Sequence, residues 1–133
     1  MQQMPRALGL DFGTTNSVVA LAGDGQSQLV DFVGARATGA VFRSALCFWH
    51  DEEAKGGLAH EAGPWAIAEY MDYPEDSRFL QSFKSVAASP IFESASVFEK
   101  RIRFEDLGQM FLARMIAHAG GALDTRPERI IVG

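Results

Sequence analysis

The first part of the chain consists of short apolar segments separated by polar ones. Short apolar runs are separated by turns that contain glycine and polar residues, a pattern typical of strands joined by hairpins. The runs predict four strands, at residues 7–10, 17–22, 27–32 and 44–49. The first three follow one another closely enough to form an antiparallel meander, and a small, polar loop at 34–39 precedes the fourth.

A helical pattern appears further along the chain. Residues 59–70 predict a helix that can accommodate Pro64 only in its first turn, where the missing N–H is not needed. The core-facing side of this helix is predicted to contain Trp65, Ala68 and Met71.

The strongest helical pattern runs over residues 102–123. Acidic residues in its first turn suit the helix dipole, and paired glycines at 120–121 weaken its other end. Its broad apolar face comprises Leu107, Phe111, Leu112, Met115, Ile116 and Ala119. Residues 77–86 predict a loop and an edge hairpin. Residues 129–133 begin a strand in which the chain stops, as expected of a fragment of a longer domain.

Composition narrows the possible partners. With 47% hydrophobic and 22% charged residues among 133, the chain has the make-up of one globular domain. A net charge of −5 argues against nucleic acid as a partner. Cys47 is the only cysteine, which excludes a disulfide within the chain and favours a reducing compartment. No apolar run suits a membrane span or a signal sequence, so we expect a cytoplasmic protein with no membrane partner.

The turn between the first two predicted strands carries the clearest candidate chemistry. The first strand ends at Asp11, and the turn contains Gly13, Thr14, Thr15 and Asn16. Gly13 can adopt positive φ and lets a ligand approach, while successive amides in such a turn form a concave anion site. Asp11 would repel a phosphate there unless a cation lay between them, and Mg²⁺ binds carboxylate, water and phosphate oxygens in this way. The turn therefore predicts a nucleoside triphosphate site, the alternative being a hairpin whose residues only satisfy turn geometry.

The histidines predict no metal site. His50, His60 and His118 lack the mutual spacing of zinc ligands. His118 lies near the end of the second predicted helix, where the dipole favours a charged imidazole.

Residues 9–20 resemble the first phosphate loop of the DnaK-type heat-shock chaperones, which belong to the actin-like ATPases. The matching residues read Gly-Leu-Asp-Phe-Gly-Thr-Thr-Asn-Ser-Val-Val-Ala. Weaker resemblances follow in the family's order, to its Pro-Ser-Val strand, its Gly-Glu-Ala helix start, its lysine hairpin and its returning strand, at residues 44–48, 60–62, 82–85 and 128–133. Residues 73–85 and 104–107 look closer to the divergent YegD-like branch than to DnaK itself.

The resemblance implies an α/β fold, the ribonuclease-H-like first lobe of an actin-like ATPase nucleotide-binding domain. Residues 1–50 and 102–133 would form its core subdomain, with the three-strand meander and a core helix, and residues 51–101 an inserted subdomain. It also implies an ATP-binding and ATP-hydrolysing lobe of a molecular chaperone, whose unfolded polypeptide clients and co-chaperones would bind through regions absent here. The fragment alone is expected to be inactive, because its sequence holds no second glycine-rich phosphate loop.

The same resemblance assigns roles to individual residues. Asp11 would orient the water shell of Mg²⁺, and Lys84 would hold the attacking water against the γ-phosphate, which makes these two the candidate catalytic residues. The phosphates of ATP or ADP would be bound by Gly13, Thr14, Thr15 and Asn16. K⁺ is a further candidate cation. The alternative for Lys84 is an exposed lysine that discourages pairing at a sheet edge.

Two departures from the family's pattern leave other functions open. Arg43 stands where the family has proline, and Ser85 where it prefers arginine. The alternatives are a sugar- or glycerol-kinase-like phosphotransferase, an actin-like filament protein and a non-catalytic scaffold of the same fold. Such kinases usually continue into a Gly-Trp-x-Glu motif, which this sequence lacks, and a filament protein would lack the lysine hairpin.

Overall fold

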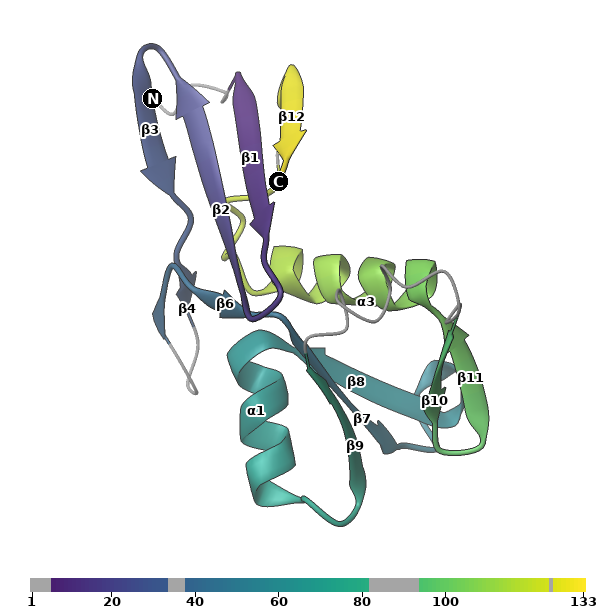
Figure 1. Ribbon diagram of the computed structural model, residues 1–133. Helices are drawn as coiled ribbons and strands as arrows, with labels where there is room; N and C mark the ends of the chain where they lie inside the picture. Colours follow the sequence, from purple (N-terminus) through teal and green to yellow (C-terminus); the bar gives the residue numbers. More distant parts are fainter. Residues whose placement is uncertain (1–5, 34–37, 82–93, 125) are drawn as a thin grey trace.

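The computed structural model describes residues 6–33, 38–81, 94–124 and 126–133. Their fold is mixed α/β, with a mixed sheet, smaller antiparallel sheets and two helices. Figure 1 shows the largest sheet in the upper part of the molecule, a second sheet in the lower part, and the longer helix crossing between them. Predictions that concern residues 82–93, including the lysine hairpin, lie outside the described residues.

The largest sheet begins with the predicted meander. Its path places β12 (Arg129–Val132), β1 (Ala7–Phe12), β2 (Asn16–Gly23) and β3 (Gln26–Leu29) side by side, and the short β6 (Phe42–Arg43) also pairs with β2. β1, β2 and β3 are antiparallel, whereas β12 runs parallel to β1. The expected three-strand meander and the returning strand are therefore confirmed.

The third strand ends earlier than the predicted 27–32. Pairing with β2 continues to Val30, whose N–H bonds to the Val19 carbonyl at 2.8 Å. The chain then bends, because Phe32 is completely buried against the ring of Phe42 at a centroid distance of 4.8 Å. Phe32 consequently belongs to β4 (Phe32–Val33), which pairs with β5 (Thr38–Gly39) in a separate two-stranded sheet.

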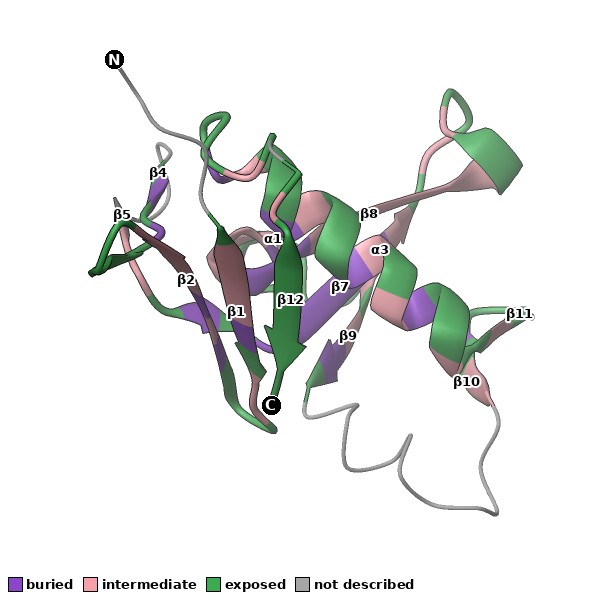
Figure 2. Ribbon diagram, turned by 90° about the horizontal axis from the view of Figure 1, so that it is seen from above, coloured by how far each residue is buried: buried purple, intermediate pink, exposed green. Residues whose placement is uncertain are grey.

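A second sheet is built around β7 (Ala45–His50). β8 (Leu58–Ala62) and β9 (Ser77–Gln81) pair with its two edges, both antiparallel. Residues 45–48 are buried, so partners on both sides satisfy the backbone groups of this strand. Figure 2 shows β7 buried along most of its length, in contrast with the exposed β12.

The predicted start of the first helix is wrong, whereas the edge strand predicted after this helix is confirmed. The helix α1 (Gly63–Asp72) begins four residues later than expected, because residues 59–62 pair with β7 instead. Gly63 makes the change of direction possible: its φ is +60°, and a Cβ there would lie 2.5 Å from the ring of Phe42. Residues 77–81 form β9 along the other edge of β7, which agrees with the strand expected around Phe79 and Leu80, and the rest of that predicted hairpin lies outside the described residues.

The other predictions for α1 are confirmed in part. Pro64 does lie in its first turn, as predicted. Trp65 packs against the core while partly exposed, and Ala68 is also partly buried. Met71 is 73% exposed, so its predicted place in the core is wrong, because it lies in the last turn, just before the exposed residues 72–76.

The second helix, α3 (Phe104–Ala117), packs between the sheets. Leu107, Phe111 and Met115 are buried, as the periodicity predicts, and Phe111 meets Phe12 of β1 edge-on at 5.2 Å. The helix is shorter than 102–123 because Ile102 pairs instead within a hairpin of β10 (Ser94–Val97) and β11 (Lys100–Arg103). The apolar face is also narrower than expected: Ala119 is buried, but Leu112 and Ile116 are exposed.

Candidate functional site

The turn between β1 and β2 closes tightly over two threonines. The Gly13 N–H donates a hydrogen bond to the Asn16 carbonyl at 3.0 Å, which leaves Thr14 and Thr15 at the tip. Figure 1 shows this turn at the lower end of the two strands, close to β6. Five predicted site residues are therefore gathered on one hairpin: Asp11, Gly13, Thr14, Thr15 and Asn16.

Gly13 serves this turn for a reason other than the one expected. Its φ is not in the positive range, so the predicted left-handed conformation is wrong. A Cβ at this position would lie only 2.4 Å from the carbonyl oxygen of Asn16. Glycine is needed because the turn brings backbone against backbone, which a side chain would obstruct.

A buried pair of serines fixes the position of the turn. The Ser44 hydroxyl donates to the Gly13 carbonyl at 2.7 Å, and the Ser44 N–H donates to the Thr15 carbonyl at 2.8 Å. The Ser17 hydroxyl lies 2.9 Å from Ser44 Oγ. Since a hydroxyl has one proton and that of Ser44 goes to a carbonyl, Ser17 is the donor in this second bond. Both serines are buried, so the start of β7 holds the turn from below.

Sequence reasoning missed this role of Ser44. The residue was expected only as the first residue of a strand, and its contact with Gly13 joins positions 31 apart in the sequence. A serine just before a buried apolar strand is a weak signal by itself, because only the fold supplies its partner.

The exposed groups of the turn suit an anion accompanied by a cation. Within the described part of the chain, no hydrogen bond engages the amides or hydroxyls of Thr14 and Thr15, and none engages the carboxylate of Asp11. Leu10 faces the core, so the next residue, Asp11, projects from the opposite face of the sheet and is exposed. Two successive amides can donate to a phosphate, and a nearby carboxylate can bind the Mg²⁺ that accompanies it.

The turn supplies only one side of such a site. Asp11, Thr14, Thr15 and Asn16 are all exposed, so a ligand bound here would still face solvent. Among the described residues there is no group of three or more histidine, cysteine, aspartate or glutamate side chains that could hold a metal alone. The one carboxylate of Asp11 fits Mg²⁺ held largely through water and phosphate oxygens. Lys84, the other candidate catalytic residue, lies outside the described residues.

His118 has a structural environment at the end of α3. Its Nε2 lies 2.9 Å from Glu61 Oε1 of β8, and its ring stacks on Trp65 of α1 at a centroid distance of 3.6 Å and an angle of 7°. The residue therefore joins three elements. This placement agrees with its predicted structural role at the helix end.

Burial shifts the pKa values of Cys47 and His60. Burial raises the pKa of the Cys47 thiol, so this cysteine stays protonated near neutral pH and is a poor nucleophile. Burial, and next the charge of Arg114, lower the pKa of His60, which keeps that ring neutral near pH 7. Neither group lies on the β1–β2 turn.

Comparison with known proteins identifies no relative of this chain: no protein-family model matches it, and no curated protein matches it either. In the part of the chain that the structure describes, neither helix has the length and apolar character needed to cross a membrane.

Proposed function

We propose that this chain is the first phosphate-binding lobe of an actin-like ATPase of the DnaK type, in its YegD-like branch. The observation that carries the proposal is the β1–β2 turn. Within the described residues, the amides of Thr14 and Thr15 at its tip have no hydrogen-bond partner and lie beside the Asp11 carboxylate, which has none either. This arrangement supports recognition of a metal-bound polyphosphate in preference to a turn that serves geometry alone.

The strand order supports the finer fold proposal. A ribonuclease-H-like lobe requires an antiparallel meander followed, after a helix, by a strand parallel to the first. The described chain has β3, β2 and β1 in this order, with β12 parallel to β1 and α3 before it. The proposed subdomains are residues 1–50 with 102–133, and 51–101.

In the proposed site each residue has a limited task. Asp11 orients the water shell of Mg²⁺, which neutralises phosphate charge, and K⁺ is a further candidate cation. The phosphates of ATP or ADP are bound by Gly13, Thr14, Thr15 and Asn16. Because the Gly13 N–H is already bonded to Asn16, the amides of Thr14 and Thr15 carry most of this contact. Lys84 positions the attacking water, and hydrolysis also needs a second carboxylate and phosphate loop.

The cellular setting follows from the same proposal. A chaperone of this type works in the cytoplasm on unfolded polypeptides, with co-chaperones, through regions outside these 133 residues. Neither nucleic acid nor a membrane is proposed as a partner.

A titration of the ¹⁵N-labelled chain with ATP, with and without Mg²⁺, tests the proposal. We expect saturable shifts of the Thr14 and Thr15 amides that require Mg²⁺, with a dissociation constant of about 1 mM, because only one side of the nucleotide is held. The variant Asp11→Asn is expected to abolish the effect of Mg²⁺. Asp24→Asn is the matched control, since Asp24 lies in the β2–β3 turn at the opposite end of β2.

The outcomes of this titration are distinct. Mg²⁺-dependent shifts at the tip that disappear in Asp11→Asn and persist in Asp24→Asn would support the proposal. Absence of shifts at Thr14 and Thr15, or equal shifts in both variants, would overturn it. Release of phosphate by a longer protein that carries both lobes, lost in Lys84→Ala while ATP still binds, would distinguish an ATPase from a non-catalytic scaffold.

A further inference from the structure

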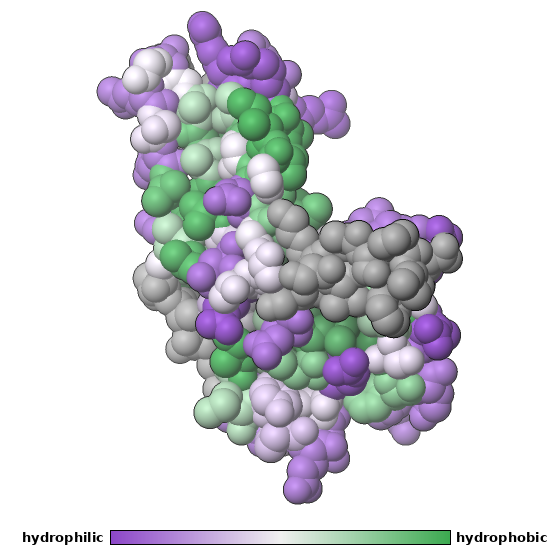
Figure 3. All heavy atoms as spheres, viewed as in Figure 1, coloured by the Kyte–Doolittle hydropathy of each residue, from purple (hydrophilic) through white to green (hydrophobic). Residues whose placement is uncertain are grey.

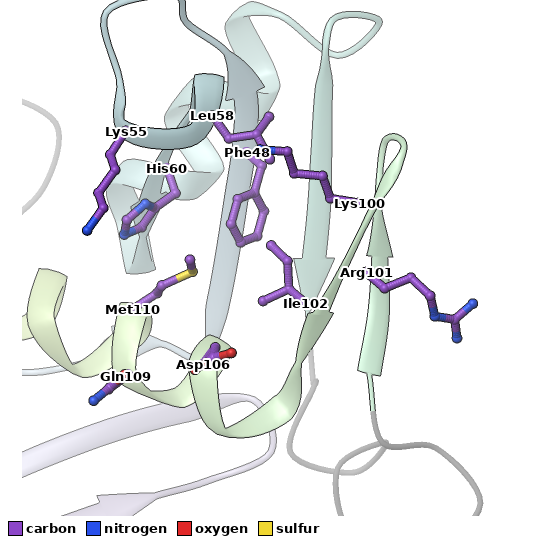
Figure 4. A pocket seen from close by; sticks show the side chains of 10 residues that line it. All are labelled: Phe48, Lys55, Leu58, His60, Lys100, Arg101, Ile102, Asp106, Gln109 and Met110. Carbon is purple, nitrogen blue, oxygen red and sulfur yellow. The ribbon is translucent and has the colours of Figure 1, made fainter.

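A hollow of about 360 Å³ lies on another part of the molecule, between the second sheet, the β10–β11 hairpin and α3. Its volume is near the lower end of the range of about 300–1,000 Å³ that is usual for small-molecule pockets. None of the residues of the β1–β2 turn lines it. Figure 4 shows side chains from β8, β11 and α3 around Phe48 of β7, while Arg101 and Gln109 point away from it.

Contacts with the second sheet and with the turn before β8 hold the β10–β11 hairpin in place and so shape the hollow, among them the bond from Arg78 Nε of β9 to the Ser96 carbonyl at 3.0 Å. The ring of Phe98, at the tip of the hairpin, lies on the ring of His50 at a centroid distance of 4.2 Å. The ammonium group of Lys100 donates a hydrogen bond to the Gly56 carbonyl, in the short turn before β8. Gly56 and Gly57 both have positive φ, and this local conformation brings the turn to the rim of the hollow.

The inner surface of the hollow is apolar and partly aromatic. Phe48 lies behind its centre and is only 1% exposed, so the accessible apolar surface comes from Leu58, Ile102 and Met110 around it. The His60 ring forms part of the wall, 5.9 Å from the ring of Phe48. Because burial lowers the pKa of His60, its ring is neutral near pH 7 and offers one donor and one acceptor. A flat apolar body would find the ring of His60 and the polarisable thioether of Met110 here.

Positively charged residues outnumber negatively charged ones among the residues that line the hollow. Lys55 and Lys100 carry positive charge on its rim, and Figure 4 shows Lys100 reaching from β11 toward Leu58 while Arg101 points away. Among the described residues that line the hollow, Asp106 is the only acid. One proton of the Lys100 ammonium is used on Gly56, which leaves two for a ligand. This local excess of positive charge contrasts with the net charge of −5 of the chain.

We propose that this hollow binds a small aromatic carboxylate. The aromatic body lies against Ile102 and Met110, over the buried Phe48, and the carboxylate group is bound by Lys100, with Lys55 adding positive charge to the rim. An apolar pocket with a few convergent polar groups has the usual composition of a small-molecule site. The hollow is separate from the β1–β2 turn, so the proposal does not depend on nucleotide binding.

The test is a titration of the ¹⁵N-labelled chain with 2-naphthoate, with 2-naphthylmethanol as the neutral control ligand. We expect saturable shifts of amides in β8, β11 and the first half of α3, with a dissociation constant of about 1 mM or lower. Naphthylmethanol is expected to bind at least about fivefold more weakly, since it lacks the charge that the two lysines attract.

Variants on the rim are expected to act in opposite directions. Lys100→Gln removes the charge but keeps a donor for the Gly56 carbonyl, and is expected to weaken naphthoate binding up to about fivefold. Asp106→Asn removes the repelling carboxylate and is expected to tighten binding. Arg101→Gln, a loss of charge on the same strand from a side chain that points away, is the matched control and should leave the affinity within about twofold.

Each outcome of these titrations either supports or overturns the proposed carboxylate site. Shifts confined to the hollow, with Lys100→Gln weaker and Asp106→Asn tighter than the wild type, support the site. Equal affinity for naphthoate and naphthylmethanol, equal effects of Lys100→Gln and Arg101→Gln, or absence of saturable shifts would overturn it. Since Asp106→Asn must strengthen binding, loss of folding cannot imitate the expected result.

Discussion

The Ser44 side chain donates a hydrogen bond to the Gly13 carbonyl at 2.7 Å, and this contact fixes the β1–β2 turn on the start of β7. The turn is exposed at its tip but is held from beneath by groups that are buried. The position of the amides at the tip therefore depends on a hydrogen bond that no ligand touches. A site that must present two amides together gains from such rigid support, because less conformational freedom is lost on binding.

Removal of the Ser44 hydroxyl should lower the stability of the fold. In Ser44→Ala the Gly13 carbonyl and the buried Ser17 hydroxyl lose their partner, so we expect a loss of about 1–3 kcal/mol in the free energy of unfolding, measured with urea. Ser27→Ala, at an exposed position of β3, should change the stability by less than about 0.5 kcal/mol. Equal stabilities of the two variants would show that the serine pair does not hold the turn.

Gly13 and Gly9 lie on the same hairpin and should respond differently to alanine. A Cβ at Gly13 would lie 2.4 Å from a backbone oxygen, whereas a Cβ at Gly9 has no neighbour within 4 Å. We expect Gly13→Ala to destabilise the fold by about 1–3 kcal/mol, because the turn must open. Gly9→Ala should be neutral or stabilise by up to about 1 kcal/mol, since it restricts the unfolded chain. The same urea experiment compares them, and similar losses would contradict the turn geometry.

The stability of the chain should fall in mildly acidic solution, in part through His60. Burial lowers the pKa of this residue below its ordinary value of 6.5. The unfolded state therefore binds a proton more readily than the folded state, so its contribution to stability is complete above pH 6.5 and is lost as the pH falls toward the folded pKa. Urea midpoints measured between pH 7.5 and pH 5 should decline less steeply in His60→Gln than in the wild type. Parallel curves for the two proteins would contradict a lowered pKa.

Local pattern was enough to predict part of this fold. β1 and β2 follow from two short apolar runs joined by a turn with glycine, and Leu107, Phe111 and Met115 follow from helical spacing, because these signals lie within a few neighbouring residues. The parallel return of β12 came from a resemblance between sequences. Amino-acid composition does not predict that β12 pairs in parallel with β1.

Tertiary pairing decided the segment that was predicted wrongly before the first helix. Residues 59–62 have a weak local preference for helix, and they become a strand because β7 needs a partner on the edge opposite β9. Likewise, the Ser44 contact with Gly13 depends on how β6 and β7 approach the turn, which no short stretch of sequence encodes. The sequence from Asp11 to Asn16 was enough to predict a phosphate site at the tip of the turn. It was not enough to predict that Ser44 holds this turn in place.

The measurement closest to the central claim uses Mn²⁺ in place of Mg²⁺, since its unpaired electrons broaden the signals of nearby amides. With ATP present, we expect substoichiometric Mn²⁺ to broaden the amides of Asp11, Thr14 and Thr15 first, and to leave the β2–β3 turn around Asp24 unaffected. Asp11→Asn should remove this selectivity. Equal broadening at both turns, or broadening at the β1–β2 tip that does not require ATP, would contradict a metal-bound polyphosphate at this site.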